Sequence, residues 1–334
     1  MATKQQFIDF LTEIEPKQST VDSCSSAHTT LRDKLKNHES FKSVHSDTFL
    51  SGSYKRDTAI RPKTVDGKVS RPDVDIIVVT LHTRNDEPSA VIDQLYDALV
   101  DCGYQNLRKN RRSVSVLNAT VDMDVVPIIP SEGGDHYWIP DKEEGTWIRT
   151  NPPGHTDWAT QVNKEAGCRF KPLVKMLKWW KRENLPDLRR PKGFILEALV
   201  AARMSYTETG YEALLEELFT SVKNSYSLHA ALGVVPHLED PAVPGNNVFS
   251  AVKIEEFREF YNLLCAHVDL IAEARAETDA DKQLAKWREV FGRCFPAAGG
   301  ATKAAASLLL PAAAATGLSF PARAVTPNKP QGFA

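Results

Sequence analysis

Two short runs of the sequence place aspartates inside otherwise apolar segments. Asp73 and Asp75 precede four Ile or Val residues, and Asp122 and Asp124 stand in a similar run. Alternate side chains of a β-strand point to the same face, so each run sets two carboxylates side by side. Carboxylates in such surroundings are costly to bury or change their pKa. A divalent cation such as Mg²⁺ would relieve that cost, because hard cations prefer carboxylate oxygens.

A turn that suits phosphate groups lies upstream of the first run. Gly52 tolerates a positive φ and lets a ligand approach the backbone, and Ser53 offers a hydroxyl and a backbone N–H. A third carboxylate follows Asp75 by 49 residues if it is Asp124, and the residues alone leave Asp122 open as well. Two metal ions on three carboxylates are the arrangement for phosphoryl or nucleotidyl transfer.

This ordered set resembles the signature of the polymerase-β-like nucleotidyltransferases. Residues 52–60 and 123–127 are similar in particular to the bacterial cGAS/DncV-like nucleotidyltransferases (CD-NTases), and the same pattern occurs in oligoadenylate synthases. The resemblance covers most of residues 40–260. It implies an α+β fold, in which a polymerase-β-like core of a small mixed sheet with helices faces a helical C-terminal lobe, with the site in the cleft between the two.

The resemblance also assigns roles to the residues of both motifs. It implies that Asp73 and Asp75 bind both metal ions, and that Asp124, directly before an apolar pair and a proline, binds the ion that activates the acceptor hydroxyl. Gly52 and Ser53 would hold the β- and γ-phosphates of the donor nucleotide. The implied cofactor is Mg²⁺, as two ions, for which Mn²⁺ can substitute.

A helix that follows the core is expected to contribute basic side chains to the site. Lys171, Lys175, Lys178 and Arg182 fall within about 60° of one another at 100° per residue. The resemblance implies that lysines of this helix bind the donor triphosphate, and Lys171 and Lys178, one heptad apart, fit that spacing best. The alternative is a solvated basic face.

Two further positions are candidates for contacts with the nucleoside. The resemblance places an aromatic residue that stacks on a base at Phe194, and such stacking contributes roughly 1–3 kcal/mol; the alternative is a core residue. It also places a turn near the nucleotide at residues 239–248, where Asn247 or Asn246 would bond base or sugar, unless this is a plain Pro/Gly turn. The basic run 108–112 either contacts an activator or acceptor, or stays solvated at a helix–strand connection.

Composition narrows the class of protein. The chain has 334 residues, 42% of them hydrophobic and 25% charged, which suffices for one large or two smaller cores. A net charge of −2 argues against extensive nucleic-acid binding and favours a small charged substrate in a local basic patch. Five scattered cysteines and nine histidines show no metal-ligand spacing, so we expect neither zinc nor disulfides. Without a signal-peptide pattern or a long apolar run, a cytoplasmic protein that does not enter the membrane is expected.

The expected organisation has four parts. N-terminal helices over residues 1–40 pack on the C-terminal lobe, the catalytic core spans 41–155, a helical nucleotide-binding lobe spans 156–295, and a flexible Ala/Pro-rich tail spans 296–334. The core is expected to end in a loop rich in Gly, Pro and Trp over 131–155. The tail composition buries too little apolar surface to fold by itself.

The expected reaction joins nucleoside triphosphates, ATP and/or GTP, into a cyclic di- or trinucleotide. A hydroxyl of one nucleotide attacks the α-phosphorus of another, pyrophosphate leaves, and a later attack closes the ring. The resemblance implies a second messenger for an effector in anti-phage (CBASS-type) defence, and a tail conjugated by E1/E2-like machinery. The alternatives are an enzyme that extends RNA 3′ ends or makes linear oligoadenylate without a template, and a catalytically silent nucleotide-binding scaffold that acts through its tail.

Overall fold

A computed structural model describes residues 4–65, 68–118 and 120–297. The predicted tail therefore lies, from residue 298 on, outside the described residues. The helices and strands are α1 (Lys4–Ile14), α2 (Gln18–Asn37), η1 (Phe41–Ser43), β1 (His45–Leu50), α3 (Gly52–Lys55), β2 (Thr64–Val65), β3 (Lys68–Val69), β4 (Asp73–Thr80), α4 (Pro88–Asp101), β5 (Leu107–Lys109), β6 (Val114–Leu117), β7 (Asp122–Pro130), β8 (Tyr137–Asp141), β9 (Thr146–Thr150), α5 (Pro152–Glu165), α6 (Phe170–Asn184), α7 (Gly193–Arg203), α8 (Tyr211–Leu232), α9 (Ile254–Ala276), α10 (Ala280–Phe291) and η2 (Gly292–Cys294).

A seven-stranded sheet forms the centre of the catalytic core. Five strands follow the order β1-β4-β7-β6-β5, and β8 and β9 continue from β7. β4 and β7 run parallel, whereas β1 is antiparallel to β4 and β6 is antiparallel to β7. The sheet is therefore mixed, and with the helices packed on it the predicted α+β class is confirmed.

The central strand pair brings the two aspartate runs together. In the parallel register of β4 and β7, Asp73 lies opposite Asp122 and Asp75 lies opposite Asp124. Residues that oppose one another in paired strands point to the same face, as do residues two positions apart. All four carboxylates therefore share one face of the sheet.

The two faces of the sheet differ in their apolar cover. On the face without aspartates, Val74 of β4 and Met123 of β7 are buried in a core that α2 and α4 complete. On the aspartate face, a smaller apolar cluster begins only beyond Asp75, with Ile77 and Ile128 among its members. The ends of β4 and β7 that carry the aspartates are left open to a ligand.

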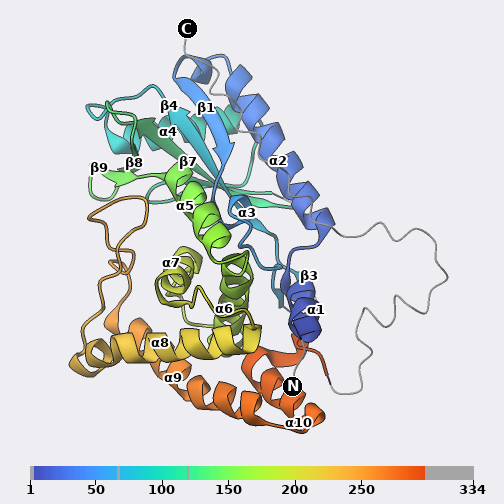
Figure 1. The fold of residues 1–334 in the computed structure, drawn as a ribbon. Helices are drawn as coiled ribbons and strands as arrows, with labels where there is room; N and C mark the ends of the chain where they lie inside the picture. The colour runs from blue at the N-terminus through green and yellow to red at the C-terminus, as the bar shows by residue number, and fades with distance from the viewer. Residues whose placement is uncertain (1–3, 66–67, 119, 298–334) are drawn as a thin grey trace, which may run out of the picture. The chain divides into compact units, whose positions relative to one another are not determined.

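The helical lobe is built around α6. In Figure 1, α6 and α7 lie between the sheet and the long pair α8 and α9, which run side by side. Leu173, Met176, Leu177 and Trp180 of α6 are fully buried in the core of this lobe, as their periodicity predicts. None of the helices in the described ranges is long and apolar enough to cross a membrane.

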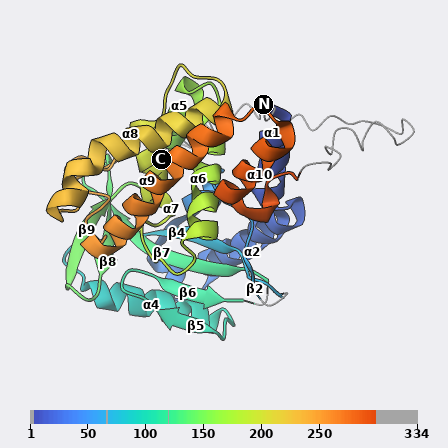
Figure 2. The same ribbon diagram turned by 90° about the horizontal axis from the view of Figure 1, so that it is seen from below.

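The two N-terminal helices pack on different parts of the molecule. Phe7 of α1 meets Trp287 of α10 edge-on, with ring centroids 5.1 Å apart, and Figure 2 shows α1 beside α10. In contrast, Leu31 and Leu35 of α2 are buried against the sheet. The sequence predicts that both helices pack on the C-terminal lobe, whereas the structure places only α1 there. The buried apolar residues of α2 pack on β1 and β4.

Residues 131–155 are not the single loop that their Gly, Pro and Trp content suggests. They contain the antiparallel hairpin of β8 and β9 and the start of α5. Tyr137, Trp138 and Ile139 in β8 are strand-forming residue types, and Gly145, with φ of +61°, serves the turn before β9. Aromatic residues within a turn-rich segment were strand signals that the prediction missed.

Candidate active site

A cavity of about 790 Å³ opens between the aspartate face of the sheet and the helices α6 and α7. Its lining combines carboxylates with an excess of three basic side chains. The basic residues are Arg56, Arg61, Arg71, Lys178, Lys181, Arg182 and Lys192, and the acidic residues are Asp73, Asp75, Asp124 and Glu197. Such a lining suits an anionic ligand that brings its own cations.

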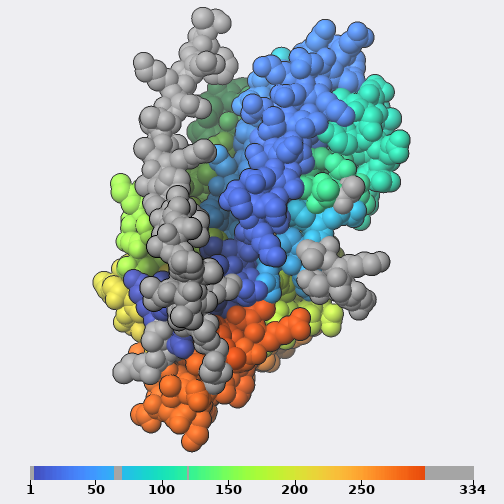
Figure 3. Space-filling model, turned by 90° about the vertical axis from the view of Figure 1, so that its right-hand side faces the viewer, coloured from blue at the N-terminus to red at the C-terminus, as the bar shows by residue number. Residues whose placement is uncertain are grey.

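A second hollow, of about 810 Å³, has different chemistry. It lies between α2 and residues 103–106, 116–118 and 120, segments that Figure 3 shows on one face of the molecule in blue and teal. Its charged lining residues are one acid, Asp22, and one base, Lys34, among serine, threonine and amide side chains. A nucleoside triphosphate, with several negative charges, is better matched by the first cavity.

The carboxylates of the first cavity destabilise one another. Burial raises the pKa of Asp75 to about 6, and the neighbouring charges of Asp73 and Asp124 add to the rise, against the opposing effect of Arg56 and Lys178. Burial also raises the pKa of Asp73, and the charges of Asp124 and Asp122 add to this rise. A bound cation would remove this repulsion.

Gly52 leaves room for the Asp75 carboxylate. It starts α3 with φ of +68°, the positive value that its position in the sequence predicts. A Cβ atom built on Gly52 would lie 1.7 Å from Oδ2 of Asp75, which no side chain tolerates. The backbone of the Gly52-Ser53 turn therefore lies directly against the carboxylate, so phosphate and metal sites would be contiguous.

The two aspartates of β7 have different surroundings. Asp124 lines the cavity, whereas Asp122 is not among the lining residues found in the described part of the chain. Nε of Arg71 lies 2.9 Å from Oδ1 of Asp122, so the two side chains form an ion pair. This difference favours Asp124 as the third carboxylate.

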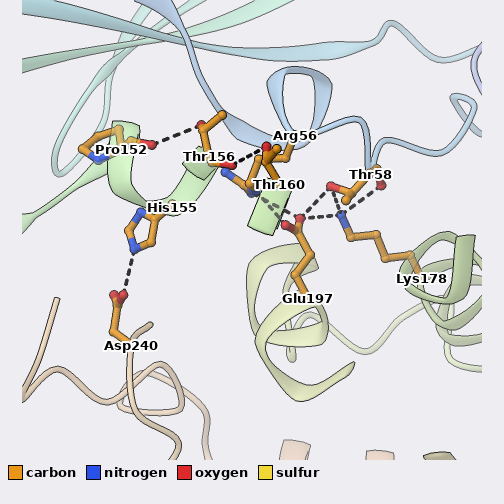
Figure 4. A network of polar contacts seen from close by, with 9 residues as sticks. All are labelled: Arg56, Thr58, Pro152, His155, Thr156, Thr160, Lys178, Glu197 and Asp240. Carbon is orange, nitrogen blue, oxygen red and sulfur yellow. Dashed lines mark hydrogen bonds and ion pairs between the residues drawn. The ribbon is translucent and has the colours of Figure 1, made fainter. Parts of the chain in front are cut away.

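A buried ionic network joins the catalytic core to the helical lobe beside Asp75. Figure 4 shows Arg56, Thr58 and Lys178 converging on the carboxylate of Glu197 in α7. Arg56 Nε donates to Glu197 Oε2 at 2.6 Å, and Lys178 Nζ and Thr58 Oγ1 each donate to Oε1 at 2.8 Å. Burial alone would raise the pKa of Glu197, but Lys178 and Arg56 outweigh it and bring the pKa to about 2.

Lys178 is therefore not part of a solvated face. Only 8% of its side chain is exposed, and its Nζ also donates to the backbone oxygen of Thr58 at 3.1 Å. Burial lowers the pKa of Lys178, against the raising effect of Glu197; with Lys178 and Arg56 both protonated, the network holds one more positive than negative charge in the cavity wall. A triphosphate would meet that excess charge.

Phe194 lines the cavity next to a polar pair. Its ring lies 4.6 Å from the ring of His155 and 5.3 Å from the guanidinium of Arg56. Figure 4 shows His155 facing Asp240, and the distance from His155 Nε2 to Asp240 Oδ1 is 2.8 Å. An aromatic surface and a polar edge thus stand together, as a site for a base requires.

Two predicted residues lie outside the lining of the cavity. Lys171 Nζ is 3.8 Å from Oδ2 of Asp57, while its neighbour Lys175 is buried in ion pairs with Asp57 and Glu15. Asn247 accepts hydrogen bonds from the backbone N–H groups of residues 238 and 249 and so shapes its own turn. The structure does not bring Lys171 and Asn247 to the carboxylates.

Sequence reasoning missed several lining residues. Glu197 had a visible signal, because it is a lone carboxylate in the apolar run of α7. Arg56 and Thr58 lie in the motif that follows Gly52, but only Gly52 and Ser53 of that motif were predicted as site residues. His155 had no signal, since its partner Asp240 is 85 residues away in the chain.

The donor set fits divalent metal ions. Asp73, Asp75 and Asp124 present carboxylate oxygens on one sheet face beside the cavity, the ligands that Mg²⁺ and Mn²⁺ accept. Among the described residues, no three His, Cys, Asp or Glu side chains stand close enough to form a ready-made metal site.

Comparison with known proteins identifies relatives of the whole chain. Residues 1–163 match the family described as "Second Messenger Oligonucleotide or Dinucleotide Synthetase domain". A "Cyclic AMP-AMP-AMP synthase" of Acinetobacter sp. (strain ATCC 27244 / 9458) is 54% identical, over 100% of this chain and 98% of the relative. A "Cyclic AMP-AMP-GMP synthase" of Enterobacter hormaechei subsp. hoffmannii (strain UCI 50) is 27% identical, over 90% of this chain and 93% of the relative.

Solved structures show the same fold at low sequence identity. CdnC of E. coli MS115-1 with ATP superposes with a TM-score of 0.70 at 20% identity, over 88% of this chain and 98% of that chain. Escherichia coli DncV in its 3′-deoxy GTP bound form gives a TM-score of 0.64 at 13% identity, over 85% and 93% of the two chains.

Proposed function

Because the chain belongs to the bacterial cGAS/DncV-like nucleotidyltransferases, which make cyclic oligonucleotide second messengers, we propose that it joins three molecules of ATP into cyclic AMP-AMP-AMP. The product named for the Acinetobacter relative, 54% identical along the whole chain, supports this choice of base and ring size. Each bond formed releases one pyrophosphate, so three ATP give one ring and three pyrophosphates.

The observation that carries the proposal is the set of three aspartates on one sheet face, in a cavity with excess positive charge. Asp73 and Asp75 stand on β4, and Asp124 stands opposite Asp75 on β7. Carboxylates gathered beside basic residues suit a substrate made of metal ions and polyphosphate. Catalysis then consists of positioning and charge neutralisation, with no covalent bond to the protein.

In this proposal each of the described residues has a separate role in binding the nucleotide. Gly52 and Ser53 hold the β- and γ-phosphates of the donor through backbone N–H groups, and Lys178 adds a positive charge from α6. Phe194 stacks on the base of a nucleotide. Lys171 and Asn247 stay predictions, because reaching the nucleotide would require them to move toward the cavity.

The metal ions are proposed to be Mg²⁺, two in number, with Mn²⁺ as a substitute. Asp73 and Asp75 would hold both ions, and Asp124 would hold the one nearest the acceptor hydroxyl. Ions bound there would lower the pKa of the attacking hydroxyl and would neutralise the leaving pyrophosphate. The protein contributes the carboxylates and keeps them on one face.

The cellular role is proposed from the family. The cyclic product acts in the cytoplasm on a messenger-responsive effector, in anti-phage (CBASS-type) defence. Conjugation of the C-terminal tail by E1/E2-like machinery is a further proposal, and it concerns residues outside the described part of the chain.

Omission of single nucleotides tests the choice of base. The purified protein is incubated with Mg²⁺ and ATP alone, with all four nucleoside triphosphates, or with mixtures that each lack one of them, and phosphatase-resistant product is quantified. The proposal predicts full product from ATP alone. A requirement for GTP would move the product to a mixed ring such as that named for the Enterobacter relative.

A further inference from the structure

The basic run 108–112 spans the end of β5 and the turn that leads to β6. This turn is closed by a 2.8 Å hydrogen bond from the backbone N–H of Asn110 to the backbone oxygen of Ser113. Asn110 is the one uncharged residue of this run, and neither triphosphate binding nor core packing accounts for it.

Two arginines of the run fix the turn in place. Nε of Arg111 and Nε of Arg112 lie 2.6 and 2.8 Å from Oδ2 of Asp141, whose side chain is fully buried in β8. Burial raises the pKa of Asp141, but the hydrogen bonds from Arg111 and Arg112 outweigh it and bring the pKa to about 2. The turn is therefore tied to the neighbouring hairpin by a carboxylate that is ionised at neutral pH.

The other side of the turn contacts Asp124. Its Oδ1 accepts hydrogen bonds from Ser113 Oγ at 2.7 Å, from Ser115 Oγ at 3.2 Å and from Asn110 Nδ2 at 3.2 Å. Asn110 Nδ2 also donates to the Oγ atoms of Ser115 and Ser113, at 2.6 and 3.2 Å. These contacts form one network on a single carboxylate oxygen.

The amide of Asn110 is itself oriented. Arg108 Nε donates to its Oδ1 at 3.0 Å, which turns the NH₂ group toward Asp124. Oδ2 of Asp124 accepts no hydrogen bond from any residue in the described ranges, and Asp124 lines the cavity. One oxygen is thus fully occupied by the protein, and the other is left for a ligand.

We propose that Asn110, Ser113 and Ser115 are positioning residues that hold Asp124 by one oxygen and aim its other oxygen at the metal ion of the acceptor hydroxyl. This inference rests on the proposed role of Asp124. Hydrogen-bond partners of a metal ligand set its orientation, and their loss typically costs about 10–100-fold in metal affinity or activity. Without them the Asp124 side chain would rotate away from Asp75, driven by the repulsion of like charges.

The test compares metal binding among matched variants of the full chain. Ser113→Ala and the double variant Ser113→Ala/Ser115→Ala remove donors, Ser115→Thr keeps the hydroxyl, and Lys109→Ala is the control. Lys109 belongs to the same run, but its Nζ pairs with Asp93, 2.6 Å away on α4. Mn²⁺ binding is titrated by electron paramagnetic resonance with a non-hydrolysable ATP analogue, and kcat and KM for ATP are measured in parallel.

The expected result is a loss of Mn²⁺ affinity of about 10-fold in Ser113→Ala and more in the double variant, with Ser115→Thr and Lys109→Ala unchanged. The kcat should fall while KM for ATP stays within about twofold. A double variant that is folded by circular dichroism and binds Mn²⁺ like the wild type would overturn the proposal. If the wild type makes no product but Ser113→Ala still binds Mn²⁺ more weakly than the wild type, the positioning role stands and the proposed function fails.

Discussion

Asp75 and Asp124 stand opposite each other in the parallel pair of β4 and β7, although they come from motifs 49 residues apart. A parallel register gives both side chains the same direction, so a metal ion can bind between two rigid strands. Asp73 adds a third carboxylate two residues upstream. Asp122 shares this face but pairs with Arg71, whereas Asp124 lines the cavity.

The first prediction separates the aspartates by function. Asp75→Asn and Asp124→Asn should each lower product formation by at least about 10³-fold, because each removes a carboxylate proposed to bind metal. Asp122→Asn should retain activity within a few-fold. Product is quantified from ATP and Mg²⁺, and near-UV circular dichroism checks the fold. An active Asp124→Asn beside an inactive Asp122→Asn would reverse the assignment.

The second prediction concerns stability and pH. The folded protein raises the pKa of Asp75 from 3.8 to about 6, so between these values the folded state binds more protons than the unfolded state. Stability from this group is therefore full below about pH 4 and is lost as pH rises to about 6, by up to about 3 kcal/mol. Measured without metal, the difference in unfolding free energy between Asp75→Asn and the wild type should grow across this window.

Added Mg²⁺ provides the complementary measurement. It should raise the melting temperature of the wild type more at pH 7.5 than at pH 5, because protonated carboxylates do not bind it. Equal Mg²⁺ effects at both pH values, together with a pH-independent difference between the two proteins, would contradict the raised pKa.

Local patterns explain which parts of the site could be predicted. Gly52, Asp73, Asp75 and Asp124 lie in short motifs whose residue types and alternation are visible without the fold. The ionic network of Glu197 was not visible, since its partner Arg56 is 141 residues away. The same holds for Asn110, whose role appears only once the β5–β6 turn is paired against β7.

Helix periodicity had a similar limit. It correctly put Lys171, Lys175 and Lys178 on one side of α6, but it could not say what faces each of them. Glu15, directly after α1, and Asp57, two residues after α3, form ion pairs with Lys175, while Glu197 of α7 faces Lys178. Tertiary contacts therefore decide which lysine reaches the cavity.

The third prediction uses Gly52. Gly52→Ala should abolish turnover, because the new Cβ would displace the Asp75 carboxylate. Gly103→Ala is the matched control, since Gly103 also has a positive φ, +87°, but nothing lies within 4 Å of its Cβ position. Both variants should lose roughly 1 kcal/mol of unfolding free energy from backbone strain, and only Gly52→Ala should lose activity. Substantial activity in Gly52→Ala would show that Asp75 need not occupy this position.

The fourth prediction compares two lysines of α6. Lys178→Ala should raise KM for ATP by about 10-fold or more, as expected for a residue that binds the ground state and the transition state alike. It should also lower the unfolding free energy by roughly 3 kcal/mol, because Glu197 loses a buried partner. Lys171→Ala should raise KM without that loss of stability. An unchanged KM in Lys171→Ala would remove Lys171 from the binding site.

The most direct test is tandem mass spectrometry of the phosphatase-resistant product that the wild type forms from ATP and Mg²⁺. The account predicts a ring of three adenylate units without a terminal phosphate, absent when Asp75→Asn replaces the wild type. A ladder of linear oligoadenylates whose terminal phosphates are removed by phosphatase would contradict ring formation. Formation of the same ring by Asp75→Asn would contradict the proposed site.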